Sequence, residues 1–343
     1  MSFIPKNANN LTISKLKKVG GGVRSDVYTF ILIYTINDVR QVCNLVLKVF
    51  EENVHPILNI DFHDYLVCER EFQVMKNLAR VGFSVPRVYL CEKDSSFIGA
   101  PFILMFQEKP IYKRLVKFDY FAKTLASLHN LNVVELGIEA LTPPKDGYAF
   151  AKFWQIHINQ LLKYSKHHKK LKKSFEKAAS WLESKSSDVY CPRYSLLHGD
   201  FHPGNVIMTN KFRLSVIDWE GAEIGDPAFD VGYSYHYVKL FSDEISPALK
   251  QKTADGFVSE YMRNYQGEIR SRLEFYKVLG VLRMAIYLSA SISNPVTFHN
   301  HYGPKALIMF PFARWPFVAK VAGCEFEMSW LQYFEEFLED TLR

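Results

Sequence analysis

The stretch HGDFHPGN, residues 198–205, decides the fold that is predicted for this 343-residue chain. It follows a strand-like run, Tyr194–His198, and its glycines and proline indicate a loop that holds side chains for a function rather than for packing. A second short apolar run, Leu214–Ile217, leads into IDWE at residues 217–220. A hairpin-like pairing of the two runs is expected to bring the loop and the IDWE segment together.

The polar residues of these two segments fit the transfer of a phosphoryl group. Asp200, Asn205 and Asp218 supply carboxylate and amide oxygens, which suit Mg²⁺, a cation that binds few protein ligands together with phosphate oxygens and water. A remaining carboxylate can accept the proton of an attacking hydroxyl group. The alternative is a pair of turns in which Asp and Asn only cap backbone groups. Any one of these residues alone would favour that alternative, but their joint spacing favours phosphoryl transfer.

Composition and charge describe a compact globular protein of two domains, or of one large domain with insertions. Apolar residues make up 48% of the chain, and the formal net charge of +6 favours anionic ligands such as nucleotides without indicating nucleic-acid binding. No secretory signal is recognised at the start, and the apolar stretch 278–292 is interrupted by Arg283, so a buried helix is expected there rather than a membrane span. The five cysteines are scattered and include no CxxC pair, so neither a disulfide framework nor a zinc site is expected, and a reducing cytoplasm fits best. They are Cys43, Cys68, Cys91, Cys191 and Cys324.

Hydrophobic patterns predict a small β-rich lobe followed by a larger helical lobe. Strands are expected at residues 27–34, 42–50, 87–91 and 101–106, with a turn at Asn37-Asp38 and a helix at 64–81 that ends at Gly82. Helices are expected at 120–131, 153–173, 175–185 and 325–342, and two more beyond Thr253, including 273–293. With a short hinge near residues 105–108, the predicted domains are an N-terminal nucleotide-binding lobe, 1–107, and a C-terminal catalytic and substrate-binding lobe, 108–343.

A lysine in one of the predicted strands needs a partner. Lys48 lies in VLKVF, where alternate residues face the core, and a buried lysine is costly unless it is paired or functional. Glu71 is the preferred partner because it shares a helix face with Met75 and Leu78, whereas Glu69 is the competing candidate. The alternative is that Lys48 extends along the surface to reach solvent.

A run of three glycines, Gly20 to Gly22, lies just before the first strong strand. Glycines let backbone N–H groups approach phosphate oxygens closely. An ordinary turn is the alternative for this run taken alone.

Together these motifs resemble the aminoglycoside phosphotransferase and choline kinase superfamily, which has a protein-kinase-like fold. The spacing of Asp200 and Asn205 also matches the kinase catalytic-loop pattern H-R-D-x-x-x-x-N. The resemblance implies an α+β fold, with a small antiparallel-sheet N-lobe and a larger, mainly helical C-lobe. It further implies that Asp200 is the catalytic base, that Asn205 and Asp218 hold Mg²⁺, and that Asp230 anchors the loop from beneath. His198 and His129 are expected to be packed supports, and His202 has no assigned role.

The same resemblance implies a nucleotide site in the N-lobe, with ATP as the co-substrate and GTP left open. The glycine run resembles the family's nucleotide-binding loop but departs from the G-x-G-x-x-G spacing. The segment FILMFQEK, residues 102–109, resembles the hinge whose backbone binds the adenine edge. The residues expected to contact or organise the nucleotide are Gly21, Gly22, Ser25, Lys48, Glu71, Phe106 and Glu108.

The predicted function is a small-molecule kinase that phosphorylates a hydroxyl group of a metabolite such as a sugar, an amino alcohol or a hydroxy amino acid. An aminoglycoside or macrolide phosphotransferase is one alternative, although residues 267–324 hold only two acidic residues against seven Lys or Arg, which disfavours a polycation site. A catalytically silent kinase-like binding protein is the other. The lysine-rich segment 163–173 is expected to be a solvated helix face rather than a site for RNA, and the His299/His301 run is expected to serve packing. Neither a membrane nor a nucleic acid is an expected partner.

Overall fold

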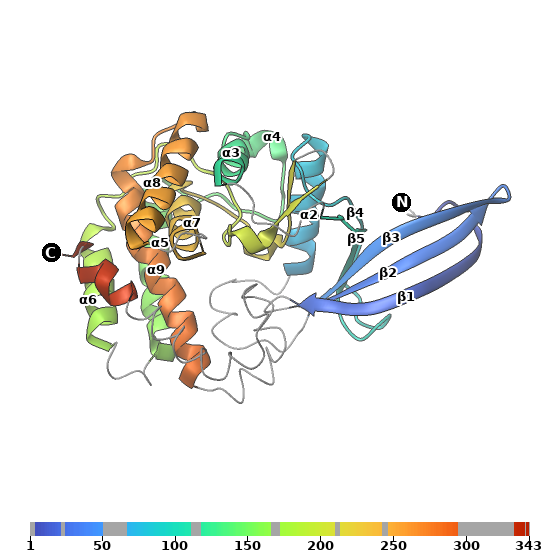
Figure 1. The fold of residues 1–343 in the computed structure, drawn as a ribbon, viewed down its shortest axis with the longest axis horizontal. Coiled ribbons are helices and arrows are strands. Elements are labelled where there is room, and N and C mark those ends of the chain that lie inside the picture. Colours follow the sequence, from blue (N-terminus) through green and yellow to red (C-terminus); the bar gives the residue numbers. More distant parts are fainter. Residues whose placement is uncertain are drawn as a thin grey trace.

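The computed structural model describes residues 4–21, 25–50, 67–110, 118–165, 172–209, 213–241, 246–293, 333–339 and 341–342. An antiparallel five-stranded sheet forms one side of the molecule, and helices form the other (Figure 1). The strand order is β1-β2-β3-β5-β4. The strands are β1 (Asn9–Gly21), β2 (Ser25–Ile36), β3 (Val39–Phe50), β4 (Val88–Glu92) and β5 (Phe102–Phe106).

The turn between β2 and β3 is the one that the sequence predicts. Asn37 and Asp38 have φ angles of 47° and 61°. A two-residue hairpin turn with positive φ at both positions matches the right-handed twist of the flanking strands. The register then runs without a break from the Ile36–Val39 pair to the Ser25–Phe50 pair.

Strand β1 was not predicted, and its geometry explains why. Its pairing with β2 shifts register at three places, and Asn10 and Lys15 have positive φ angles of 52° and 53°. Each bulge moves the following side chains to the other face, so that the alternation of apolar and polar residues is interrupted. A pattern of period two cannot be recognised in such a strand.

Helix α2 (Val67–Arg80) packs against the sheet and corresponds to the helix predicted at 64–81, of which residues 64–66 lie outside the described part. It ends where expected. Gly82 adopts a φ of 80°, and the N–H of Phe83 donates to the carbonyl oxygen of Leu78 at 3.0 Å. A glycine in the left-handed region closes the last helical turn without a steric penalty.

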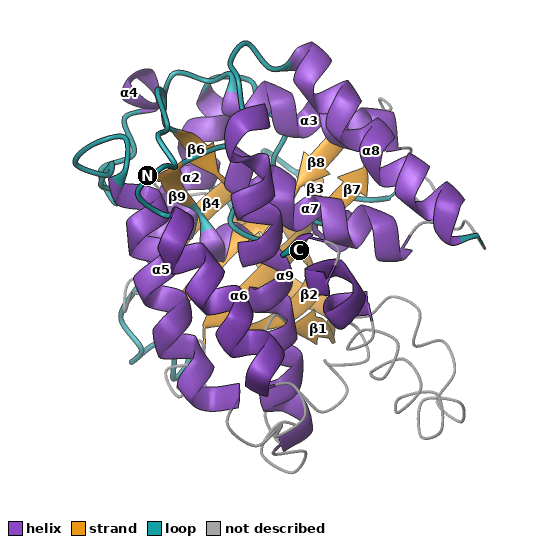
Figure 2. Ribbon diagram, turned by 90° about the vertical axis from the view of Figure 1, so that its left-hand side faces the viewer, coloured by secondary structure: helices purple, strands orange, loops and turns teal. Residues whose placement is uncertain are grey.

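The larger lobe is mainly helical, and its helices pack side by side around α7 and α9 (Figure 2). This arrangement confirms the α+β, two-lobe fold class. A continuous hydrophobic core joins the two lobes, because it includes Met75 and Ile103 of the smaller lobe together with Phe201 and Leu282 of the larger one. The helices are α3 (Phe118–His129), α4 (Val133–Leu136), α5 (Ala149–Leu161), α6 (Lys172–Lys185), α7 (Ala228–Phe241), α8 (Pro247–Asn264), α9 (Arg270–Ser293) and a last one at residues 333–339.

The predicted helices agree with α3, α6 and α9 to within a few residues. The helix predicted at 153–173 is shorter than expected: α5 ends at Leu161 and continues as a 3₁₀ helix over Leu162–Ser165, and residues 166–171 lie outside the described part. Residues 325–332 of the predicted last helix, and the His299/His301 run, also lie outside it. Among the described residues, no helix has both the length and the apolar character needed to cross a bilayer.

Helix α7 was missed by the sequence analysis. It packs against both α8 and α9, and all the residues from Ala228 to His236 are buried. A helix that is enclosed on all sides lacks the polar face that makes helical periodicity visible. Gly232 lets α9 approach closely, since a Cβ at this position would lie 2.6 Å from the carbonyl carbon of Tyr276.

Four short strands carry the predicted loop and the IDWE segment, but their pairing differs from the expectation. β6 (Ser195–Leu197) pairs with β9 (Glu223–Gly225), and β7 (Val206–Met208) pairs with β8 (Leu214–Val216). The predicted hairpin between the runs at 194–198 and 214–217 is therefore wrong. The reason is chain proximity: β7 ends at Met208 and β8 begins at Leu214, so their pairing costs little loop-closure entropy.

The last helix is held to α7 through a buried histidine, which makes stability sensitive to acid. His236 Nε2 lies 2.8 Å from the carbonyl oxygen of Lys277, and Nδ1 lies 2.8 Å from the Tyr333 hydroxyl. The carbonyl oxygen can only accept, so Nε2 carries the proton and Nδ1 accepts from Tyr333. Burial lowers the pKa of His236 to about 3, and the ring is neutral in the fold.

We expect His236 to lower the free energy of unfolding as the pH falls from 7 to 5. The unfolded chain takes up a proton below its ordinary pKa of about 6.5 and the folded chain does not, so His236 costs about 2 kcal/mol at pH 5. Urea unfolding at both pH values, compared between the wild type and His236→Gln, measures this term. An equal loss of stability in the two proteins would contradict it.

Candidate active site

The loop at residues 198–205 is anchored by one carboxylate of α7. Asp230 is fully buried and accepts hydrogen bonds from the backbone N–H groups of His198, at 2.7 Å, and Gly199, at 3.0 Å. His129 Nε2 donates to the same carboxylate at 3.2 Å, while its Nδ1 lies 2.8 Å from the Tyr261 hydroxyl. A carboxylate that accepts several hydrogen bonds in the interior fixes the backbone that supplies them.

A glycine allows this loop to lie against the IDWE segment. Gly199 has a φ of 80°, and a Cβ there would overlap with the carbonyl oxygen of Gly221. Arg283 Nη1 also donates to the Gly199 carbonyl oxygen at 2.8 Å. Both the conformation and the close approach therefore require glycine at this position.

His198 joins the loop to the strand that precedes Asp218. It is buried, and its Nε2 donates to the carbonyl oxygen of Ile217 at 2.9 Å. Burial lowers the pKa of His198, although the carboxylate of Asp230 opposes this shift. A buried, hydrogen-bonded ring of this kind supports the loop, as the sequence predicts for His198 and for His129.

Asp200 is held by three side chains. The Tyr233 hydroxyl donates to Oδ1 at 2.7 Å, Asn205 Nδ2 lies 3.2 Å from Oδ2, and His202 Nε2 lies 3.4 Å from Oδ2. Burial raises the pKa of Asp200, but His202, Tyr233 and Arg283 outweigh it and lower the pKa to about 2. The carboxylate is therefore ionised and fixed in orientation.

Tyr233 and His202 were not identified from the sequence. His202 belongs to the recognised motif but was given no role, and its ring stacks on Tyr237 with a centroid distance of 4.7 Å. Tyr233 and Tyr237 lie one turn apart in α7, the helix that carried no visible periodicity. These tyrosines could have been identified only if the sequence had predicted helix α7 and its packing beside Asp200.

Asn205 lies between Asp200 and the IDWE segment. Its side-chain Nδ2 donates to the backbone oxygen of Asp200 at 2.9 Å. Its main-chain carbonyl oxygen accepts from the N–H of Ile217 at 3.0 Å. The amide nitrogen is thus directed to Asp200, so Oδ1 is the side-chain atom that can ligate a cation. The backbone bond to Ile217 brings Asn205 next to Asp218 despite the different strand pairing.

Lys48 of β3 joins the two lobes. Its Nζ lies 3.0 and 2.8 Å from the two carboxylate oxygens of Glu71 and 2.5 Å from Asp218 Oδ1. Glu69 instead pairs with Lys93 at 3.0 Å, so Glu71 is the partner, as preferred. Burial lowers the pKa of Lys48, but the surrounding carboxylates raise it well above the ordinary value, and the ammonium group stays charged.

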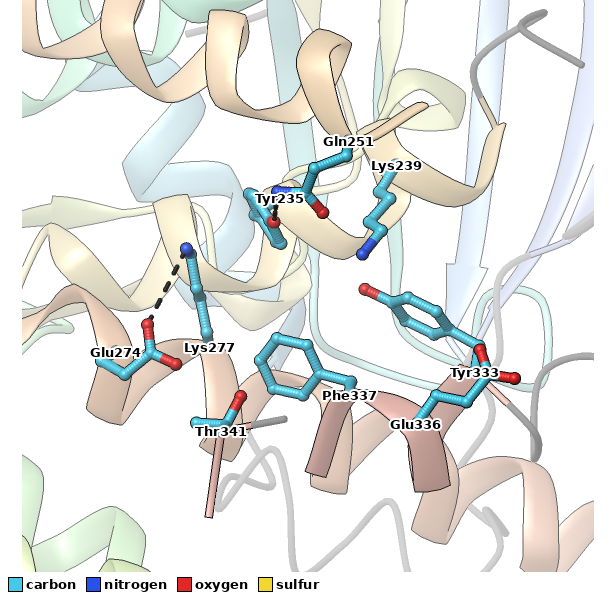
Figure 3. A pocket seen from close by; sticks show the side chains of 9 residues that line it. All are labelled: Tyr235, Lys239, Gln251, Glu274, Lys277, Tyr333, Glu336, Phe337 and Thr341. Carbon is cyan, nitrogen blue, oxygen red and sulfur yellow. Dashed lines mark hydrogen bonds and ion pairs between the residues drawn. The ribbon is translucent and has the colours of Figure 1, made fainter. Parts of the chain in front are cut away.

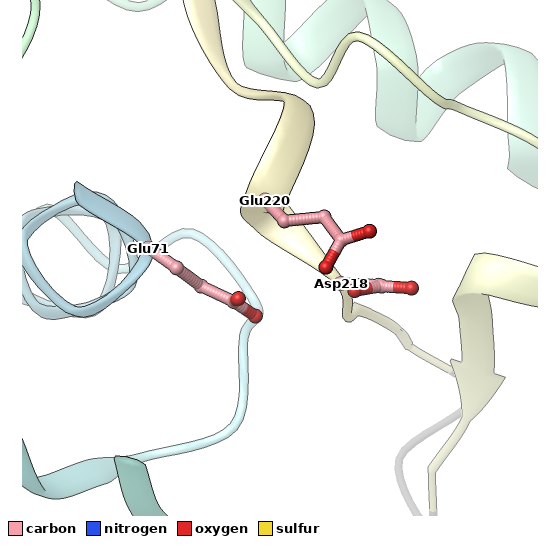
Figure 4. A group of neighbouring side chains, drawn as sticks. All are labelled: Glu71, Asp218 and Glu220. Atoms are coloured by element: carbon pink, nitrogen blue, oxygen red, sulfur yellow. The ribbon is translucent and has the colours of Figure 1, made fainter. Parts of the chain in front are cut away.

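Three carboxylates surround this ammonium group: Glu71, Asp218 and Glu220 each place an oxygen within 4.8 Å of the others (Figure 4). Glu220 Oε2 also lies 3.6 Å from Lys48 Nζ. These three acidic groups face the ammonium group and also the guanidinium of Arg70, which donates to the backbone oxygen of Glu220. One formal negative charge remains, which a divalent cation would offset. Asp218 has a φ of 66°, a strained conformation of the kind found at functional sites. Glu220 lies within IDWE and was not predicted as a site residue, although a carboxylate two residues after Asp218 was the available signal.

The residues expected at the nucleotide lie along the sheet. Gly21 ends β1 opposite Asp26, Gly22 lies outside the described residues, and Ser25 begins β2. Ser25 is fully buried, and its hydroxyl group has no hydrogen-bond partner among the described residues, a state that a phosphate oxygen would relieve.

The expected hinge follows β5. The Phe106 N–H donates to the carbonyl oxygen of Arg87 at 2.8 Å, so this N–H group is already bonded within the protein. Glu108 is half-buried just beyond, and burial raises its pKa.

A pocket of about 460 Å³ lies between α7, α8, α9 and the last helix (Figure 3). Asp200 does not line this pocket. Tyr333, which does line the pocket, packs against Tyr233 and Met284, and Tyr233 in turn contacts Asp200. The pocket is lined by Tyr235, Lys239, Gln251, Glu274, Lys277, Tyr333, Glu336, Phe337 and Thr341.

This arrangement is that of a phosphotransferase with a protein-kinase-like fold. A model of the phosphotransferase enzyme family matches residues 44–275, and the chain belongs to this family. Curated relatives include mouse acyl-CoA dehydrogenase family member 10, 27% identical over 260 residues, and human member 11, 29% identical over 184 residues. These matches cover 67% and 48% of this chain but only 23% and 22% of the relatives, so the chain spans less than a quarter of their length.

Solved structures confirm the fold. A thermostable mutant of aminoglycoside phosphotransferase APH(4)-Ia superposes with a TM-score of 0.56 at 17% identity, covering 89% of this chain and 97% of that one. Amicoumacin kinase hAmiN gives 0.56 at 14% identity, with 99% and 90% covered. Choline kinase LicA from Streptococcus pneumoniae gives 0.51 at 15% identity, with 88% and 94% covered.

We expect Asp230→Asn to destabilise the fold by about 3 kcal/mol, because charged hydrogen bonds to two N–H groups and a histidine are weakened together in the interior. Asp188→Asn is the matched control: Asp188 is exposed, and its substitution should change stability by less than about 0.5 kcal/mol. Urea unfolding of both variants measures the difference. Similar stabilities would show that Asp230 is not the anchor.

Proposed function

We propose that the chain is a small-molecule kinase that transfers the γ-phosphate of ATP to a hydroxyl group of a metabolite. The observation that carries this proposal is the setting of Asp200. Its ionised carboxylate is fixed beside Asn205, and Asn205 is bonded to the residue before Asp218, which pairs with Lys48. With Asp200 as the base, Asn205 and Asp218 as metal ligands and Lys48 as the cation, the two lobes would together supply the groups that phosphoryl transfer requires.

In this proposal the N-lobe binds the nucleotide. Lys48, held by Glu71, would contact the α- and β-phosphates and release Asp218 when the triphosphate takes its place. The backbone at Gly21 and Gly22, together with the Ser25 hydroxyl, would bind phosphate oxygens, and the backbone of Phe106 and Glu108 would bind the adenine edge. GTP could use the same phosphate contacts, so the choice of base depends on the hinge.

The donor set fits a bound Mg²⁺, because oxygen ligands and an excess of carboxylates suit a hard divalent cation. Asn205 Oδ1 and Asp218 would hold it, with Glu220 beside them. When bound, Mg²⁺ neutralises charge on the transferring phosphate oxygens.

Asp200 would orient the attacking hydroxyl group and take its proton. Its low pKa makes it a weak base, so the proton would be transferred late, as the new O–P bond forms. Tyr233 and Asn205 hold the two carboxylate oxygens, so that little reorganisation is needed at the moment of reaction.

The acceptor is proposed to be a sugar, an amino alcohol or a hydroxy amino acid. The neighbouring pocket presents two lysines and two glutamates, a balance of charge that suits a neutral or zwitterionic molecule better than a polycation. An antibiotic phosphotransferase remains the alternative within the family, since structural neighbours include an aminoglycoside phosphotransferase and an amicoumacin kinase. A silent binding protein would have little use for the ordered Asp200.

A phosphorylation panel of such metabolites, aminoglycosides and macrolides with γ-labelled ATP and GTP separates these functions. A labelled metabolite product supports the proposal. A labelled antibiotic alone favours the alternative, and nucleotide binding without any product favours the silent protein.

We expect Asp200→Asn to lower kcat by about 10²–10⁴-fold, because the base is removed while the nucleotide contacts remain. The KM for ATP should stay within a few-fold of the wild-type value. Asp188→Asn, which removes an exposed carboxylate, is the control and should leave both constants unchanged. Undiminished turnover by a folded Asp200→Asn protein would refute the role of Asp200.

Asp218→Asn should raise the Mg²⁺ concentration needed for half-maximal activity by at least about tenfold, since a neutral amide binds the cation more weakly than a carboxylate. Titration of Mg²⁺ at saturating ATP measures this value, and a chelator should abolish the wild-type reaction. Asp188→Asn, which removes an exposed carboxylate away from the site, serves as the control. An unchanged Mg²⁺ requirement in Asp218→Asn would remove this residue from the metal site.

A further inference from the structure

Two cysteines of the smaller lobe lie almost within bonding distance. The Sγ atoms of Cys68, on α2, and Cys91, on β4, are 3.0 Å apart. A disulfide bond measures about 2.05 Å, so a movement of about 1 Å separates the two thiols from a covalent link. The two cysteines are 23 residues apart in the chain, too far for a short motif to reveal them.

The pair lies next to the residues that organise Lys48. Cys91 faces Ile103 across β4 and β5, and Ile103 faces Lys48 across β5 and β3. On the other side, Cys68 precedes Glu71 by three residues in α2, and the two residues share a helix face. A bond between the thiols would therefore close a ring that runs from Lys48 through the sheet to Cys91, across to α2, and back through Glu71.

The two thiols differ in reactivity and access. Cys91 is half-buried and Cys68 is buried. The hydrogen bond with Cys68 lowers the pKa of Cys91, against burial and the nearby Glu69 and Glu92, while Lys93 assists. The same hydrogen bond and burial raise the pKa of Cys68. Cys91 is thus the thiol that forms the thiolate first and can be reached from solvent, which is the pattern of an attacking cysteine beside a resolving one.

We propose that Cys68 and Cys91 are a redox modification site, at which a reversible disulfide fastens α2 to the sheet beside the Lys48–Glu71 pair. The oxidant is a small-molecule disulfide such as glutathione disulfide. The Cys91 thiolate attacks one of its sulfurs and releases one glutathione. The Cys68 sulfur, on losing its proton, then displaces the second glutathione, so that two protein thiols are oxidised and one disulfide is reduced to two thiols.

The effect of the link is to restrict α2. In kinase-like folds the lysine–glutamate pair must be in place for phosphoryl transfer, and the position of this helix controls it. A covalent tether one turn from Glu71 would hold the helix in the position in which the pair is formed. Protein disulfides in reducing compartments are usually transient and regulatory, which suits such a device.

The test uses the 343-residue chain equilibrated in mixtures of reduced and oxidised glutathione. After acid quenching and alkylation, mass spectrometry should show two fewer alkyl groups than on the reduced protein, and peptide mapping should show Cys68 joined to Cys91. Oxidation should also slow hydrogen exchange in α2 and raise the Tm by at least roughly 2 °C, and dithiothreitol should reverse both effects.

Cys91→Ser should lose the link, the slower exchange and the rise in Tm together. Cys43→Ser is the matched control, because Cys43 is also a half-buried thiol of the same sheet and should leave all three unchanged. The proposal is overturned if the wild-type protein keeps both thiols under these conditions, carries only glutathione adducts, or forms a link that persists in Cys91→Ser. These readouts need no substrate, so the result stands whatever the acceptor of the phosphoryl group.

Discussion

The ion pairs of Lys48 are the interaction on which the rest of the structure depends. One ammonium group, 5% exposed, connects a strand of the sheet to Glu71 of α2 and to Asp218 after β8. A buried charge without its partner costs several kcal/mol, so each of these elements is stable only where the others hold it. The geometry of the loop at residues 198–205 then follows, because Asn205 is bonded to the residue beside Asp218.

Much of the fold could be predicted because its signals are local. The apolar spacing in α2, the turn at Asn37-Asp38 and the glycine that ends the helix each act within a few residues, and each agrees with the structure. The features that were missed depend on distant contacts. The pattern of β1 is broken by bulges that only its pairing with β2 defines, and α7 is enclosed by helices that lie far away in the sequence.

The candidate site divides in the same way. Asp200, Asn205 and Asp218 could be selected because short motifs fix their spacing, and Glu71 could be preferred to Glu69 because a helix face is readable from the sequence. Tyr233 contacts Asp200 across 33 positions, and no local pattern indicates that contact. The roles assigned to these residues in catalysis and in nucleotide and metal binding remain predictions.

The hydrophobic core passes without interruption from α2 and β5 into the helical lobe. A chain cut near residue 107 would therefore expose apolar surface on both fragments, and neither fragment would be expected to remain monomeric and soluble by itself. The two lobes are better regarded as one cooperative unit of unfolding than as two modules, and a change deep in the helical lobe can reach the five-stranded sheet through shared packing.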